Sequence, residues 1–170
     1  GWILPTPFVE ALYCVGSRLR PLTGTAATDA SCPTAGNRAD FVAKNPALFD
    51  ITGYAHHPYS FDVPPSSKPP FPGEVTLAKL GAFERTLQGI FSTYGRSRSG
   101  GIPLYLTEWG YKTNPPNPFV HTSLAEQARW LNQGEYMTYN DPYVRALTQF
   151  LLTDDPPNKG FKPGTRQYWS

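Results

Sequence analysis

The order of three apolar runs and two helical segments constrains the fold of this chain more than any other feature. Each apolar run ends in polar residues, and the runs cover residues 48–59, 102–110 and 143–153. Residues 76–94 carry apolar side chains three and four positions apart, which predicts an amphipathic helix. Ser123, followed by Glu126, forms a capping box that opens a second predicted helix over residues 123–139. This strand–helix–strand–helix–strand order predicts an α/β fold with a parallel sheet, whose strands end at one common edge.

The rest of the chain is predicted to be mostly loop within a single domain. Residues 1–45 form a loop-rich segment with a short helical piece at Pro7–Tyr13, and residues 161–170 form a tail. Proline accounts for 19 of the 170 residues, about twice the usual share of roughly 5%. Many of these prolines stand in two long stretches, 60–73 and 111–121. Loops of this length in a compact domain usually carry function.

Composition and charge exclude two classes of partner. Charged residues make up 16% of the chain and the 15 cations are scattered, so a nucleic-acid-binding surface is not expected. No apolar run approaches the roughly 18 residues of a membrane span, so no membrane partner is expected. The two cysteines and three histidines do not have the spacing of a metal motif. The sequence predicts neither a metal site nor a cofactor.

The two cysteines, Cys14 and Cys32, lie in the first fifth of the chain. A disulfide between them would close a loop for which the chain-entropy model gives about 3 kcal/mol of stabilisation. The alternative is two reduced, buried thiols. A weakly charged, aromatic and proline-rich composition is typical of secreted enzymes, which favours the disulfide and an extracellular location. The chain starts at Gly1 without a signal-peptide pattern, so an exported protein would be a processed chain or a fragment.

Glu108 is the sharpest candidate for chemistry. It shares the parity of Leu104 and Leu106 in the second apolar run, so we expect it to extend their inward-facing row. A carboxylate at the end of such a row, beside Trp109, would be partly desolvated and close to a bound ligand. The alternative is a solvated glutamate at a strand end, paired with a lysine or arginine.

His57 and Tyr59 end the first apolar run on the face that carries the small residues Gly53 and Ala55. Both side chains can hydrogen-bond a carboxylate or a sugar hydroxyl, and Tyr59 is a candidate to orient Glu108. A structural role for His57 stays open. His56 points to the opposite face, so the two histidines are not expected to share a metal ion.

Further candidates for substrate binding are acidic or aromatic. Asp155 ends the third apolar run together with Asp154, where it would line a subsite or form an acidic turn before a Pro-Pro pair. Trp109 is expected to be exposed, with Tyr111 and Phe119, so that these rings can stack on sugars. Trp130, at a helical spacing, is expected in the core.

These motifs resemble the C-terminal half of a clan A glycoside hydrolase, the (β/α)8 group related to families 5 and 39. The resemblance rests on His-Pro-Tyr at residues 57–59 and Leu-Thr-Glu-Trp-Gly at residues 106–110, followed by the helix 123–139 and the third run. It covers residues 46–160 and implies about the last three β/α units of a TIM barrel. A complete barrel needs roughly 200 residues or more, so this chain would form part of one.

The resemblance also implies roles for individual residues. Glu108 matches the nucleophile after strand seven, and His57 and Tyr59 match a His-x-Tyr pair whose tyrosine hydrogen-bonds that nucleophile. The general acid/base of the family is a glutamate in an Asn-Glu-Pro type motif, which this sequence lacks, and Glu10 has the wrong neighbours. Retaining hydrolysis needs a second carboxyl group about 5–5.5 Å from the nucleophile, and Asp155 is the candidate on the same edge.

The expected function is therefore a retaining glycoside hydrolase that acts on O-glycosidic bonds of an oligosaccharide or polysaccharide, with its acid/base outside this chain. The alternative is a non-catalytic carbohydrate-binding or assembly module derived from a half-barrel. Its partner would be a missing N-terminal half-barrel or a second copy of the chain. An esterase is less favoured because the sequence has no G-x-S-x-G motif.

Overall fold

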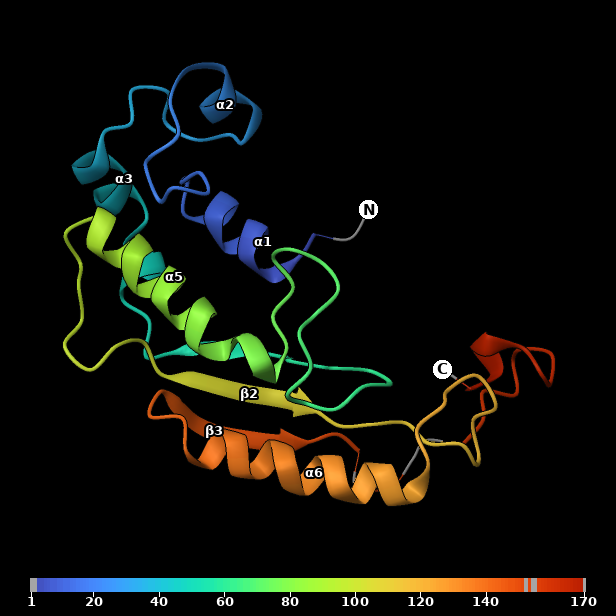
Figure 1. Ribbon diagram of the computed structural model, residues 1–170. Coiled ribbons are helices and arrows are strands. Elements are labelled where there is room, and N and C mark those ends of the chain that lie inside the picture. Colours follow the sequence, from blue (N-terminus) through green and yellow to red (C-terminus); the bar gives the residue numbers. More distant parts are fainter. Residues whose placement is uncertain (1–2, 152, 154–155, 170) are drawn as a thin grey trace.

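The computed structural model describes residues 3–151, 153 and 156–169. At its centre lies a parallel sheet in the order β1-β2-β3, formed by Tyr54–His56, Leu104–Trp109 and Val144–Gln149. Helix α5 (Leu80–Thr93) connects β1 to β2, and helix α6 (Leu124–Tyr139) connects β2 to β3 (Figure 1). The described part of the chain is thus an α/β structure with a three-stranded parallel sheet.

The described residues also form shorter helices and 3-10 turns. These are α1 (Pro5–Leu12), α2 (Gly24–Asp29), α3 (Arg38–Lys44), α4 (Pro46–Phe49), η1 (Leu77–Lys79) and η2 (Arg166–Trp169). Helix α1 starts at Pro5, two residues before the predicted helical piece, because proline is favoured in the first turn of a helix. Helix α2 was not predicted, since its residues, Gly-Thr-Ala-Ala-Thr-Asp, have no apolar periodicity.

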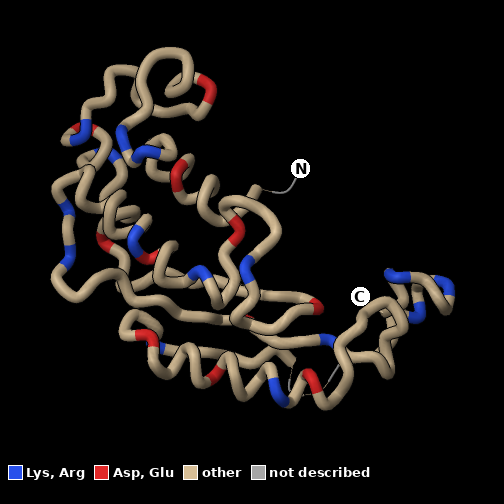
Figure 2. Tube along the Cα trace, in the orientation of Figure 1, with Lys and Arg blue, Asp and Glu red and all other residues tan. Residues whose placement is uncertain are grey.

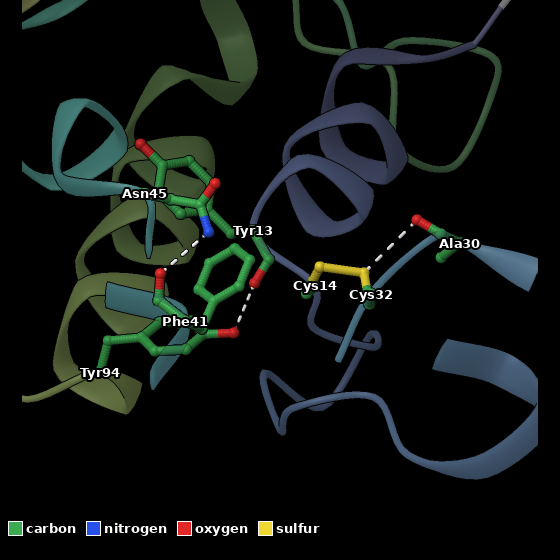
Figure 3. The surroundings of a disulfide bond; sticks show 7 residues. All are labelled: Tyr13, Cys14, Ala30, Cys32, Phe41, Asn45 and Tyr94. Carbon is green, nitrogen blue, oxygen red and sulfur yellow. Dashed lines mark hydrogen bonds between the residues drawn. A yellow bond between two sulfur atoms is a disulfide. The ribbon is translucent and has the colours of Figure 1, made fainter. Parts of the chain in front are cut away.

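The N-terminal segment packs on α5 through aromatic rings and is cross-linked within itself by a disulfide (Figure 3). The Cys14–Cys32 disulfide, with Cα atoms 5.7 Å apart, ties the end of α1 to the residues after α2. Next to it, the Tyr94 hydroxyl donates to the Tyr13 carbonyl at 2.6 Å. The ring of Tyr13 contacts Phe49 and Phe91, with ring centroids 5.5 and 5.6 Å apart. The loop-rich segment is therefore an ordered part of the core.

Both predicted long helices are present, and α6 begins at the predicted capping box. At the start of α6, Ser123 Oγ accepts from the Glu126 backbone N–H at 3.2 Å, and Glu126 Oε2 accepts from the Ser123 N–H at 2.9 Å. Helix α5 buries residues three and four positions apart, namely Leu80, Phe83, Leu87, Ile90 and Phe91. It ends before Gly95, whose φ of 67° lies in the left-handed region that favours glycine.

The strands are shorter than the apolar runs suggested. Of the first run, 48–59, only Tyr54–His56 is a strand, so the prediction of a strand over the whole run is wrong. Pro46 starts the short helix α4, whose Phe49 joins the aromatic cluster instead. The third run forms a strand only as far as Gln149.

The two faces of the sheet differ in what covers them. Tyr54 and His56 pack against Phe83 of α5, and the register places them beside Leu104 and Leu106, which are completely buried. On the opposite face, described residues such as Ala55 and Thr107 are exposed. Of the described helices, none is both long and apolar enough to cross a bilayer.

Candidate functional site

The candidate site lies where β1 and β2 end. His57 and Tyr59 follow β1, and Glu108 stands one residue before the end of β2. Because the two strands are parallel neighbours, their carboxyl ends meet at one edge of the sheet. The structure brings these three predicted residues together, although His57 and Glu108 are far apart in the sequence.

Tyr59 and His57 contact the same carboxylate oxygen of Glu108. The Tyr59 hydroxyl donates to Glu108 Oε2 at 3.1 Å, and His57 Nδ1 lies 3.4 Å from the same oxygen. Among the described residues, none donates a hydrogen bond to the other oxygen, Oε1. The Glu108 side chain is 35% exposed, so Oε1 is available to a ligand while Oε2 fixes the orientation of the carboxylate.

The histidine is itself oriented by a second partner. His57 Nε2 lies 3.0 Å from Thr107 Oγ1, so the two ring nitrogens contact consecutive residues of β2. An imidazole held at both nitrogens has a defined ring plane, which fixes the direction from which it approaches Glu108.

The Tyr59 hydroxyl keeps its proton, and so remains a hydrogen-bond donor, over the whole physiological pH range. Burial, then the hydrogen bond to Glu108 and the charge of that carboxylate, raise the pKa of Tyr59 to about 12. The phenol therefore stays protonated, and its hydroxyl can serve Glu108 only as a donor. The Tyr59 hydroxyl therefore acts on Glu108 through the hydrogen bond that holds its Oε2 in place.

The side chain of Glu108 lies on the other face of the sheet from the one predicted. Between Leu106 and Trp109, β2 advances three residues while β3 advances two, from Leu147 to Gln149. This irregularity breaks the strict alternation of side chains. As a result Thr107 and Glu108 both contact His57 on the face of the sheet that carries the exposed Ala55 and Thr107, here called the open face. The prediction that Glu108 extends the row of Leu104 and Leu106 is wrong, because that row faces the helices.

Trp109 is not exposed, contrary to the prediction. Because of the irregularity in β2, Trp109 rather than Glu108 faces the helices, and Trp109 is 1% exposed. Its ring lies against Gly134 of α6, where a Cβ atom would collide with it. Tyr111 is also buried, with its ring between Trp109 and Trp130. Neither Trp109 nor Tyr111 therefore presents an exposed face on which a sugar could stack, and Trp130 is in the core as predicted.

A cavity of about 370 Å³ opens beside Tyr59. Its wall includes aromatic and charged side chains from loops that follow each strand, among them Phe61, Asp62, Lys112, Phe119, Phe150 and Arg166. Of these, sequence reasoning named only Phe119. The signal that could have found others was the length of the two proline-rich loops, which supply Phe61, Asp62 and Lys112.

The second carboxyl group that retaining hydrolysis needs is not assigned among the described residues. Asp155, like Asp154, lies outside the described residues. Glu10 belongs to α1, and burial raises its pKa. Asp62 lines the cavity, and its Oδ1 accepts from Thr122 Oγ1 at 3.2 Å. Within the described part of the chain, no group of His, Cys, Asp or Glu side chains is arranged to hold a metal ion.

Three kinds of comparison were made with known proteins. No family model, curated protein or solved structure matches this chain.

Proposed function

We propose that this chain carries the nucleophile of a retaining glycoside hydrolase that acts on O-glycosidic bonds of an oligosaccharide or polysaccharide. The observation that carries the proposal is the Glu108 carboxylate, with one oxygen held by Tyr59 and His57 and the other receiving no hydrogen bond from any described residue. A nucleophilic carboxylate needs a fixed orientation and an oxygen directed at the reacting carbon, and this arrangement supplies both.

The proposed reaction has two steps. In the first, Glu108 Oε1 attacks the anomeric carbon, the bond from that carbon to the leaving oxygen breaks, and a general acid protonates this oxygen. In the second, the residue that acted as general acid takes a proton from water, and the water oxygen displaces Glu108 from the anomeric carbon. This restores the Glu108 carboxylate. The resemblance assigns that acid/base to a glutamate after the fourth strand of the barrel, a part that does not correspond to this chain.

The fold supports the proposal at the level of architecture. Parallel strands joined by helices, with chemistry-bearing side chains at their carboxyl ends, are the repeating unit of a (β/α)8 barrel. We propose that β1, β2 and β3 are the last three strands of such a barrel and that the exposed face of the sheet is its interior. The Cys14–Cys32 disulfide supports an extracellular location, because disulfides persist in oxidising compartments.

The decisive variant is Glu108→Gln in the full-length enzyme. Replacing a nucleophile removes the covalent route, so turnover of a glycoside substrate should fall about a thousand-fold or more. Thermal unfolding should be nearly unchanged, because the side chain is partly exposed. Glu135→Gln, at an exposed glutamate of α6, is the matched control and should keep full activity.

A covalent trap gives an independent readout. A 2-deoxy-2-fluoro glycoside with a good leaving group should label Glu108, and peptide mass spectrometry should locate the label there. Wild-type turnover in Glu108→Gln, or a label on another residue, would show that Glu108 is not the nucleophile.

A non-catalytic carbohydrate-binding or assembly module is the second candidate function. The observation in its favour is that β1 and β3 each pair along one edge only among the described strands. Unpaired edges are templates for another chain, so a second copy or a separate half-barrel could close the sheet. Light scattering and glycan titration test this, and a monomer without glycan affinity would exclude it.

A further inference from the structure

The cavity beside Tyr59 has an aromatic wall suited to a sugar ring. The rings of Tyr59 and Phe61 are stacked, with centroids 6.3 Å apart and planes 26° apart. Phe61 is 70% exposed, and Phe119 also lines the cavity. Flat apolar rings around a few polar groups are what a small-molecule site offers. Because Tyr59 also donates to Glu108, a sugar in this cavity would adjoin the reacting carboxylate.

Two cations project from the wall of the same cavity, Lys112 and Arg166. Lys112 Nζ donates to the Trp169 carbonyl at 3.2 Å, and Arg166 lies over the ring of Phe119 with its Cζ atom 5.4 Å from the centroid. Stacking uses the face of the guanidinium and leaves its in-plane N–H donors for a ligand. Among the described residues, no carboxylate forms an ion pair with either cation.

The C-terminal segment that supplies Arg166 is also cationic. Residues 156–169 contain Lys159, Lys162 and Arg166 and no aspartate or glutamate. In Figure 2 the C-terminal segment carries lysine and arginine and no aspartate or glutamate among its described residues. The one described carboxylate on the cavity wall, Asp62, is already bonded to Thr122. An anionic ligand would therefore meet two cations with which no described carboxylate forms an ion pair.

We propose that this cavity is a subsite for a sugar unit that carries an anionic substituent, a carboxylate or a sulfate ester, held by Lys112 and Arg166. This rests on the proposed function, in which Glu108 cleaves the neighbouring glycosidic bond. The guanidinium fork pairs with two oxygens of such a group, and the ammonium supplies a second point of contact. Phe61 and Phe119 hold the ring of the same sugar unit.

Calorimetric titration of the full-length protein with three β-1,4-linked glucose disaccharides tests the subsite. They differ only at C6 of the non-reducing sugar, which carries a hydroxyl, a carboxylate or a sulfate. We expect at least one anionic probe to bind about ten-fold more tightly than the neutral one, because hydrogen bonds to charged groups are worth more than neutral ones. The more tightly bound probe identifies the substituent. Equal affinity for all three, or no binding, overturns the proposal.

Variants distinguish binding by the two cations of the cavity wall from a general effect of the positive charge in residues 156–169. Lys112→Gln and Arg166→Gln should each reduce the preference for the anionic probe over the neutral one. Lys159→Gln, a cation of the same segment that does not line the cavity, should keep the preference. If Lys159→Gln lowers the preference as much as Lys112→Gln, the effect is a general field and the subsite assignment fails.

The two proposals fail in different ways. Loss of turnover in Glu108→Gln with no preference among the probes would keep the hydrolase and remove the subsite. A preference for an anionic probe with normal turnover in Glu108→Gln would keep the binding site and remove the nucleophile assignment.

Discussion

His56 and His57 are neighbours in the sequence and have opposite environments. His56 faces the helices, where its Nε2 lies 2.8 Å from the Val75 carbonyl and its ring packs on Phe83. His57 faces the open side of the sheet, where it contacts Thr107 and Glu108. The same residue type therefore supports the core at one position and a carboxylate at the next. What separates them is the alternation of a strand, which sends consecutive side chains to opposite faces.

The comparison extends to the whole sheet. The helix-facing residues of β2, Leu104 and Leu106, are completely buried, while Tyr105 and Thr107 between them are exposed. We therefore expect substitutions on one face to change stability and substitutions on the other to change binding or turnover.

The largest effect on stability should come from Leu106→Ala. Removing a fully buried leucine leaves a cavity between β2 and the helices, which should lower the free energy of unfolding by about 2–5 kcal/mol. Thr107→Ala, the next residue on the open face, should change it by less than about 0.5 kcal/mol. Urea denaturation of both variants measures the difference. Equal destabilisation would show that the open face is covered in solution.

The histidine pair should show a smaller difference of the same kind. His56→Ala should lower the free energy of unfolding by about 1–3 kcal/mol, because it removes a partly buried hydrogen bond and the packing on Phe83. His57→Ala should leave stability within about 0.5 kcal/mol of the wild type. A comparable loss in both variants would contradict the division between the two faces.

His56 also makes stability depend on pH in a defined direction. Burial is the main reason that the pKa of His56 is lowered from its ordinary value of 6.5. The unfolded chain therefore binds a proton at His56 before the folded chain does, so stability falls as the pH drops below about 6.5. Chemical denaturation at pH 5.5 and 7.5 should show this loss in the wild type. The loss should be smaller in His56→Ala, whereas an identical loss in that variant would place its origin in other groups.

Tyr59→Phe removes a single hydrogen bond on the exposed side of the sheet. The ring and its stacking on Phe61 stay, so the free energy of unfolding should change by less than about 1 kcal/mol. Turnover should fall about ten-fold, because Glu108 loses the donor that orients its carboxylate. The measurement is kcat for a glycoside substrate, with Tyr136→Phe on the exposed surface of α6 as the control. Unchanged kcat would show that Tyr59 does not position Glu108.

Several features could be predicted because they depend on local rules. The capping box at Ser123 and the spacing of apolar residues in α5 specify helices without help from distant contacts. The Tyr59–Glu108 contact was anticipated on other grounds, because both residues end predicted parallel strands and because the resemblance implies a tyrosine that hydrogen-bonds the nucleophile.

Other features could not be predicted, because distant packing decides them. The first apolar run looked like one strand, but Phe49 is drawn into a cluster with Tyr13, Phe91 and Tyr94, so Pro46–Phe49 is helical. The cavity wall is built from loops, whose paths follow from the elements they connect rather than from a periodic pattern. That is why Phe61, Lys112 and Arg166 were not anticipated.

The sequence by itself determined the order of the elements, the residue types at the sheet edge and the identity of Glu108 as the acid to examine. Tertiary structure alone decided the face on which Glu108 lies. The mismatch between β2 and β3 after Leu106 turns Trp109 into the core against Gly134 and leaves Glu108 beside His57. Such an irregularity depends on how two strands pair and what packs on them, and neither is encoded in the periodicity of one strand.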